Sequence, residues 1–203
     1  SYDDGANPQT AVRPMTGTGV APAELVINEA PIYDFGNTII GNSIFQTFTV
    51  TNIGGIDATS MTGSGLAVPF AFRGGAYPGI GGTCGATLAA GANCSIVLSY
   101  TPVSITIDSD TVEINYFDGA ATQTATRDLT GQGTAPGLLV ISESPLYDFG
   151  TIATTGAATR IFTVSNIGGA TTTAMAGAGI AAPFSYLGGT YPGTGGTCAL
   201  SLA

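Results

Sequence analysis

Short stretches of alternating apolar and polar residues recur along the whole chain, separated by clusters of Gly, Pro, Asn and Thr. The clearest stretch is 44–52, where Phe48 and Val50 share one face while Thr49 and Thr51 share the other. Other predicted strands cover residues 25–27, 32–36, 69–72, 95–100, 111–116 and a closing segment that ends near 129. No helical period persists beyond about two turns.

Turn chemistry separates these strands. The sequence Asn-Ile-Gly-Gly at 52–55 ends the strongest strand, and Asp118-Gly119 predicts a hairpin turn into the closing strand. Residues 56–68 are weakly patterned, with Met61 and Leu66 as the expected core contacts. About seven short strands with turns between them predict an all-β fold, a two-sheet antiparallel sandwich of the immunoglobulin-like type.

The pattern repeats with a spacing of 114 residues. Tyr-Asp-Phe-Gly occurs at 33–36 and again at 147–150, and the strand end at 48–55 recurs at 162–169. When residues 1–89 are laid over 115–203, no gap is needed and 47 of the 89 positions are identical. A unit of 114 residues is long enough to bury its own core, so the sequence predicts tandem sandwich modules rather than a solenoid.

The repeat predicts three parts. Residues 1–21 match 115–135 and are the C-terminal strands of a preceding repeat, 22–135 are a complete repeat, and 136–203 are the N-terminal part of the next. The joints at 21–23 and 135–137 are short and contain Pro, so adjacent units should be semi-rigidly coupled. The last unit lacks counterparts of 90–114, which leaves an open edge and an uncovered apolar face. We expect a window of a longer array.

Composition narrows the range of functions. The net charge is −9, and all four cations are Arg, which argues against nucleic acid and anionic membrane surfaces as partners. No apolar run approaches the roughly 20 residues of a membrane span. The chain contains no His or Lys, so the usual general base is missing, and we expect no catalytic residues and no enzyme activity.

Acidic pairs are the remaining candidates for chemistry. Asp108 and Asp110 are candidate calcium ligands, but Ca²⁺ prefers six to eight oxygens, so a solvated loop is the competing interpretation and no cofactor is expected. Asp3-Asp4 and Glu113 also lie beside predicted turns. The glycine-rich loop at 74–82 lacks the Lys and the following helix of a phosphate cradle. Tyr77, in that loop, is expected to pack over it rather than to stack on a sugar.

Cysteine spacing bears on the cellular compartment. Cys84 and Cys94 lie ten residues apart in one unit, which favours a disulfide and an oxidising compartment over an incomplete zinc site or a reduced pair. Cys198 is the counterpart of Cys84, and its partner would fall at position 208, outside this sequence.

Several motifs together resemble a known family. These are Asp34-Phe35-Gly36, Val50…Asn52…Gly54, Cys84…Leu88…Gly91…Cys94, Tyr100-Thr101-Pro102 and the closing segment 129–133. In order and spacing they resemble the bacterial choice-of-anchor D repeats, which belong with the ASPM/SPD-2/Hydin (ASH) group of immunoglobulin-like modules. The resemblance implies non-catalytic modules of long secreted or cell-surface proteins.

We therefore expect a structural repeat of an extracellular stalk, fibre or adhesin, whose partners are neighbouring repeats or identical chains. Two alternatives stay open at this point. In the first, the chain is a filament protomer, in which the tail 1–21 of one chain docks on the open unit of the next by strand complementation. In the second, it is a calcium- or carbohydrate-dependent binding module.

Overall fold

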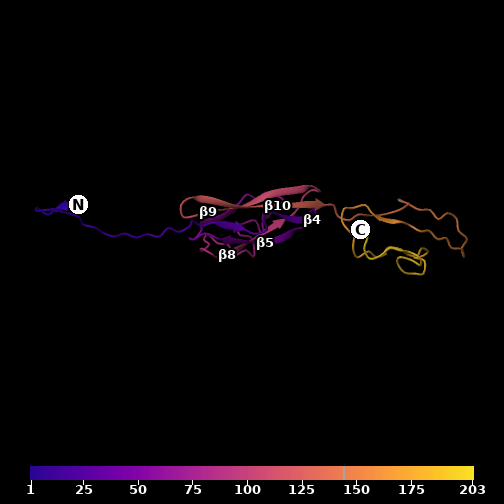
Figure 1. Ribbon diagram of the computed structural model, residues 1–203. Coiled ribbons are helices and arrows are strands. Elements are labelled where there is room, and N and C mark those ends of the chain that lie inside the picture. The colour runs from indigo at the N-terminus through magenta and orange to yellow at the C-terminus, as the bar shows by residue number, and fades with distance from the viewer. Residues whose placement is uncertain (144) are drawn as a thin grey trace.

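The computed structural model describes residues 1–143 and 145–203, and in these ranges it contains strands and no helix. Figure 1 shows a small N-terminal hairpin, an extended segment, a central two-layered body and a C-terminal segment following one another along the chain. The strands are β1 (Tyr2–Asp3), β2 (Pro8–Gln9), β3 (Leu25–Ile27), β4 (Ile32–Ile39), β5 (Ile44–Asn52), β6 (Thr59–Ser64), β7 (Phe70–Phe72), β8 (Asn93–Tyr100), β9 (Ile107–Phe117), β10 (Thr122–Thr134), β11 (Leu139–Ile141) and β12 (Val164–Asn166).

The central body is a β-sandwich of two four-stranded sheets, with strand orders β4-β10-β9-β6 and β3-β5-β8-β7. One inner face contributes Phe48, Ile96 and Leu98, and the other contributes Ile114 and Leu129; all five side chains are fully buried in one cluster. Inward positions alternate with more exposed ones along each strand, as the pleat requires. The prediction of an all-β fold is confirmed.

Most strand positions agree with the predictions, but several lengths do not. The strands predicted at 25–27 and 44–52 have these bounds in the structure, and Met61 is buried as expected. In contrast, β9 and β10 extend beyond their predicted limits and pair antiparallel from Thr122↔Phe117 to Gln132↔Ile107. Each supplies the hydrogen-bond partners of the other, so their length depends on the pairing rather than on either strand's own alternation.

The prediction of a wholly antiparallel sandwich was wrong at one place. β4 and β10 are parallel, with a register that runs from Asp128↔Ile32 to Thr134↔Ile39 and a shift between Thr130 and Gln132. β3 pairs with β5 in one sheet, whereas β4, which is separated from β3 by residues 28–31, belongs to the other. A parallel pair needs a long connection, and the whole sandwich between β4 and β10 supplies it.

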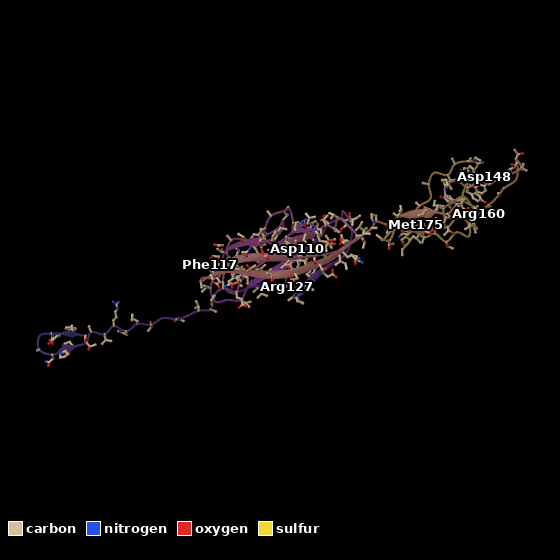
Figure 2. The ribbon with its side chains drawn as sticks, turned by 90° about the horizontal axis from the view of Figure 1, so that it is seen from above. Asp110, Phe117, Arg127, Asp148, Arg160 and Met175 are labelled. Carbon is tan, nitrogen blue, oxygen red and sulfur yellow. A yellow bond between two sulfur atoms is a disulfide. The ribbon has the colours of Figure 1, made fainter. Side chains whose placement is uncertain are left out.

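A buried arginine holds the crossing between the two sheets. The Arg127 side chain leaves β10 (Figure 2), is 8% exposed, and donates from Nε to the Asn28 carbonyl at 2.9 Å and from Nη1 to the Pro31 carbonyl at 2.8 Å. Its Nη2 donates to the Ile27 carbonyl. The planar guanidinium group has five N–H donors, so it can donate to several acceptors at once. These carbonyls therefore have partners at the point where the chain leaves one sheet, and their dipoles solvate the buried charge.

A buried asparagine joins four segments at one end of the sandwich. The Asn52 side chain is fully buried, and its Oδ1 accepts from the amides of Glu24 at 3.2 Å and Gly54 at 3.0 Å. Its Nδ2 donates to the carbonyls of Ile56 at 2.8 Å and Leu88 at 3.0 Å. All four hydrogen-bonding positions of the amide group are thus used, as a polar side chain at this depth requires.

The C-terminal segment repeats part of this arrangement. β11 pairs with β12 from Leu139↔Asn166 to Ile141↔Val164, the same register, 114 residues later, as Leu25↔Asn52 to Ile27↔Val50. The Asn166 side chain accepts from the amides of Leu138 and Gly168 and donates to the carbonyls of Ala170 and Leu202, which are the counterparts of the four Asn52 partners. Phe162 is only half-buried, whereas its counterpart Phe48 is fully buried.

Replacement of the buried amide tests its contribution. We expect Asn52→Ala to lower the free energy of unfolding of the sandwich by about 3 kcal/mol, because two amides and two carbonyls lose their partner inside the protein. Urea unfolding followed by far-ultraviolet circular dichroism measures the change. Asn37→Ala is the matched control, since Asn37 is exposed, and should change stability by less than about 0.5 kcal/mol. Equal effects of the two substitutions would contradict this role of Asn52.

Candidate functional site

The two acidic residues proposed as calcium ligands lie on β9 and are used in separate hydrogen bonds. Asp108 accepts from the Tyr100 phenol at 2.8 Å and from the Thr106 hydroxyl at 3.3 Å. Asp110, labelled in Figure 2, accepts from the backbone amides of Ala67 and Thr111, both at 2.8 Å. In the part of the chain that the structure describes, no group of three or more His, Cys, Asp or Glu side chains is placed to hold a metal ion.

The other acidic candidates serve turns and strand edges. Asp4 accepts the amides of Asn7 and Ala6, and these hydrogen bonds lower the pKa of its carboxyl group. Asp118, the counterpart of Asp4, accepts the amides of Ala121 and Ala120, and its pKa is lowered for the same reason. Asp3 accepts from the amide of Gly5, and Glu113 accepts from the hydroxyl of Ser64 at 3.2 Å. These carboxylates stabilise local structure and do not converge on one point.

The glycine-rich loop uses its backbone to pack on β8. The Arg73 amide donates to the Val97 carbonyl at 2.9 Å, and the Val97 amide donates to the Pro78 carbonyl at 2.8 Å. Gly79 has φ 90°, and a Cβ there would lie 2.1 Å from the Val97 carbonyl oxygen, so only glycine allows this approach. The loop thus extends the sheet beside β8. Its backbone groups are hydrogen-bonded to this strand, whereas those of a phosphate cradle point at the bound ligand.

Tyr77 packs over this loop, as the sequence predicted. Its ring lies edge-on to Phe72 with 5.7 Å between centroids, and its phenol donates to the Gly85 carbonyl at 3.2 Å. Burial raises the pKa of Tyr77 to about 12. The side chain is half-buried and has a structural partner at each end.

The disulfide that the sequence predicted lies directly after the glycine-rich loop. Cys84 and Cys94 are bonded, with 4.8 Å between their Cα atoms. Cys94 belongs to β8, and the amides of Thr83 and Cys84 both donate to the Ser95 carbonyl, at 2.8 and 3.0 Å. The bond therefore ties the end of the glycine-rich loop to a central strand of the sandwich. A disulfide of this kind is typical of proteins in an oxidising compartment.

Two hollows among the described residues are relevant to binding. One, of about 230 Å³, lies between β6 and β7 and is lined by Gly63, Ser64, Gly65, Leu66, Ala71, Phe72 and Gly75. The other, of about 350 Å³, lies in the C-terminal segment and contains Cys198, a free cysteine, in its lining. Neither lining includes a charged side chain, so neither offers an acid–base pair to a substrate.

The structure also bears on membrane insertion. Within 1–143 and 145–203 there is no helix that is long and apolar enough to cross a bilayer.

Comparison with known proteins shows distant structural similarity. No protein-family model and no curated protein matches the sequence. The fold is similar to part of the VesB protease of Vibrio cholerae, with 17% identity and a TM-score of 0.43 over 55% of this chain and 32% of that one. It is similar to the ASH/PapD-like domain 7 of human CEP192, with 16% identity and a TM-score of 0.40 over 64% of this chain and 97% of that one.

A third similar structure is a Porphyromonas gingivalis protein of unknown function, with 10% identity and a TM-score of 0.41 over 55% of this chain and 46% of that one. The chain thus spans about a third of the VesB protein and less than half of the Porphyromonas protein. Identities and scores this low assign no activity to the chain.

The sequence pattern did not identify two side chains that hold the sandwich together. Arg127 stands out in the sequence only as one of four arginines. The available signal was that Arg13 occupies the same position in the preceding repeat. The sequence predicts Asn52 as a turn residue, whereas in the structure its amide group is the centre of a buried network. The Arg127 partners lie about a hundred residues away, and two of the four Asn52 partners, Glu24 and Leu88, lie 28 and 36 residues away, so no local pattern identifies either set of contacts.

Removal of the disulfide tests its contribution to stability. We expect the double substitution Cys84→Ala with Cys94→Ala to lower the free energy of unfolding by about 2–3 kcal/mol, because the unfolded chain regains the freedom of a loop of ten residues. Urea unfolding under non-reducing conditions measures the loss. Cys198→Ala is the control and should leave the sandwich transition unchanged. A similar loss with Cys198→Ala would contradict the assignment.

Stability should fall at alkaline pH because of the buried phenols. The pKa of Tyr77 rises from an ordinary value of 10.0 to about 12 on folding, so the unfolded state loses its proton first. The stabilisation that the buried, protonated Tyr77 phenol provides is complete below pH 10 and is lost as the pH rises from about 10 to 12. Burial, and secondarily the hydrogen bond to Asp108, also raises the pKa of Tyr100.

We expect Tyr77→Phe to reduce the slope of unfolding free energy against pH between 10 and 12, as measured by urea unfolding at several pH values. Tyr2→Phe is the control, because Tyr2 is 57% exposed and lies outside the sandwich. If Tyr77→Phe, like Tyr2→Phe, kept the full slope of the unchanged chain, burial of the Tyr77 phenol would not be the cause of the loss of stability at alkaline pH.

Proposed function

We propose that this chain is a structural, non-catalytic segment made of tandem immunoglobulin-like modules with a 114-residue repeat. In this proposal, it forms part of an extracellular or cell-surface stalk, fibre or adhesin. The modules are those of 22–135 and 136–203, and 1–21 are the closing strands of a preceding one. The sequence repeat, the repeated β3–β5 and β11–β12 register and the resemblance to choice-of-anchor D and ASH-type repeats support it.

The parallel pairing of β4 with β10 is the observation that carries the proposal. β4 is the second strand after the N-terminal joint, following the short β3, and β10 leads into the C-terminal joint, so tension that passes through β3 pulls β4 and β10 in opposite directions. Because they are parallel, Ile32 and Thr134 lie at opposite ends of the pair. The pull is then a shear that loads all of their hydrogen bonds together. An antiparallel terminal pair would instead open one bond at a time.

The joints transmit this tension with little slack. β10 continues to Thr134, and the Gly169 amide donates to the Pro136 carbonyl at 3.3 Å just beyond it. At the preceding joint, the Gly55 amide donates to the Ala21 carbonyl at 3.2 Å, and the Ala23 amide donates to the Asp118 carbonyl at 3.0 Å. The joint residues are therefore hydrogen-bonded to the unit that follows, so adjacent units behave as coupled bodies rather than as beads on a loose string.

The disulfide limits how far a unit can extend. The Cys84–Cys94 bond keeps the segment 84–94 closed after the strands have separated. The chain has no Lys, so isopeptide bonds between Lys and Asn or Asp side chains cannot form within it, and the disulfide is the internal covalent link. The net charge of −9 keeps such a surface soluble and discourages lateral association. These properties suit a spacer in an oxidising medium outside the cell.

Single-molecule stretching tests this function. With the chain held at Ser1 and Ala203, we expect the sandwich to unfold in one step at high force, because the terminal pair is sheared. Reduction of the disulfide should lengthen that step by about 30 Å, since ten more residues become extensible at about 3.3–3.6 Å each.

The control is a second direction of pulling. With the same chain held at Ile107 and Gln132, which face each other at one end of the β9–β10 pair, the pairs open one after another and the unfolding force should be severalfold lower. Equal low forces in the two directions would reject the mechanical role.

A further inference from the structure

The two sheets of the sandwich differ in charge. The strands of the β4-β10-β9-β6 sheet carry five carboxylates, which are those of Asp34, Asp108, Asp110, Glu113 and Asp128. The strands of the β3-β5-β8-β7 sheet contain no acidic residue, and the glycine-rich loop 74–82 beside them contains none either. An anionic group therefore meets less repulsion over the second sheet than over the first.

One exposed cation lies at the edge of this second sheet. Residues 22–135 contain two cations, of which Arg127 is buried, whereas Arg73 is exposed and directly follows β7. Among the described residues the ion pair joins Arg160 to Glu143, so Arg73 has no carboxylate partner within salt-bridge distance. The charge of Arg73 is thus available to a ligand.

An aromatic ring holds the Arg73 guanidinium in place. Its Cζ lies 4.5 Å from the centroid of the Phe45 ring, which is 51% exposed. Phe45 belongs to β5 and Arg73 follows β7, so the arginine side chain reaches across β8. Stacking on the ring leaves the N–H groups at the edge of the guanidinium free for two parallel hydrogen bonds to a carboxylate. It also fixes the orientation of the group before a ligand arrives, which lowers the cost of binding.

Hydroxyl groups surround the ring on the outer face of the sheet. Thr47 and Thr49 follow Phe45 at alternate positions of β5, and both are exposed. On β8, Ser99 lies opposite Phe45 and Ser95 lies opposite Thr49. Each hydroxyl group can donate one hydrogen bond and accept others, as the hydroxyl groups of a sugar do. An exposed ring beside such a row offers both an apolar contact and hydrogen bonds to a chain of sugars.

The next unit indicates that the fold does not need the stacked pair. Thr159 and Leu187 occupy the counterpart positions of Phe45 and Arg73, although 47 of the 89 aligned positions are identical. Both members of the pair are thus replaced, while the adjacent Gly-Gly-x-Tyr-Pro-Gly sequence is kept. The pair is therefore a feature of the surface of one unit rather than a requirement of the sandwich.

We infer that the outer face of β5, β8 and β7 binds a glycan that is mostly neutral and carries one carboxylate. Arg73 pairs with the carboxylate, the Phe45 ring contacts the apolar face of a sugar, and the hydroxyls of Thr47 and Thr49 bind neighbouring sugars. One exposed cation matches one carboxylate, and the net charge of −9 disfavours a polyanion. This inference goes beyond the mechanical role and does not rest on it.

The test is a titration of the full chain with aldotriuronic acid, in which one glucuronic acid is linked to two xylose units. Xylotriose is the matched control ligand, because it has the same length and no carboxylate. Amide chemical shifts in nuclear magnetic resonance spectra report the site and the affinity. We expect shifts at 45–49, 71–73 and 97–99, and at least about tenfold weaker binding of xylotriose, which lacks the charge-assisted hydrogen bonds.

Variants test the contribution of the stacked pair. Arg73→Gln should weaken binding of aldotriuronic acid at least about tenfold, whereas Arg13→Gln, in the N-terminal tail, should leave it unchanged. The double substitution Phe45→Thr with Arg73→Leu introduces the residues of the next unit. It should therefore keep the fold, as checked by far-ultraviolet circular dichroism, and lose binding.

Several outcomes would overturn the inference. These are no saturable binding of aldotriuronic acid, equal binding of xylotriose, or the same loss of affinity with Arg13→Gln as with Arg73→Gln. A capped Glu-Thr-Thr peptide that binds as tightly as the glycan would also overturn it, because Arg73 would then recognise a protein carboxylate rather than a sugar. The stretching experiment on the sandwich is independent of all these results.

Discussion

The buried amide of Asn52 is the interaction on which the rest of the sandwich depends. It holds the incoming joint, the end of β5, the turn after it and the loop before β8 at one point. Its counterpart Asn166 makes the same contacts although the strands that would complete a core around it have no counterpart among the described residues. The network therefore does not require the complete sandwich. Without the amide group, the two backbone amides and two backbone carbonyls that it pairs with would lose this partner.

Arg127 is the second constraint, and it links the fold to the proposed function. By binding the carbonyls of the β3–β4 crossing, it places β4 at the edge of the other sheet, beside β10. That placement produces the parallel pair and thus the shear geometry under tension. The disulfide acts on a different element, the segment 84–94 that leads into β8. In the proposed function, the β4–β10 pair thus sets the force at which the sandwich first ruptures, whereas the disulfide limits how far the chain extends after rupture.

The two acidic residues of β9 are accounted for by the same packing. Asp108 accepts a hydrogen bond from the Tyr100 phenol, and Asp110 accepts one from the Ala67 amide, so each carboxylate already has a donor within the sandwich.

The sequence by itself determined the local features: the alternation that makes β3 and β5, the Asp-Gly and Asn-x-Gly turns, and the spacing of Cys84 and Cys94. These follow from contacts between residues near one another in the chain. Only the tertiary structure decided that β4 lies parallel to β10, that Arg127 is buried, and how far β9 and β10 extend. Each depends on a partner about a hundred residues away or on strand pairing, and no local pattern of apolar and polar residues specifies such a partner.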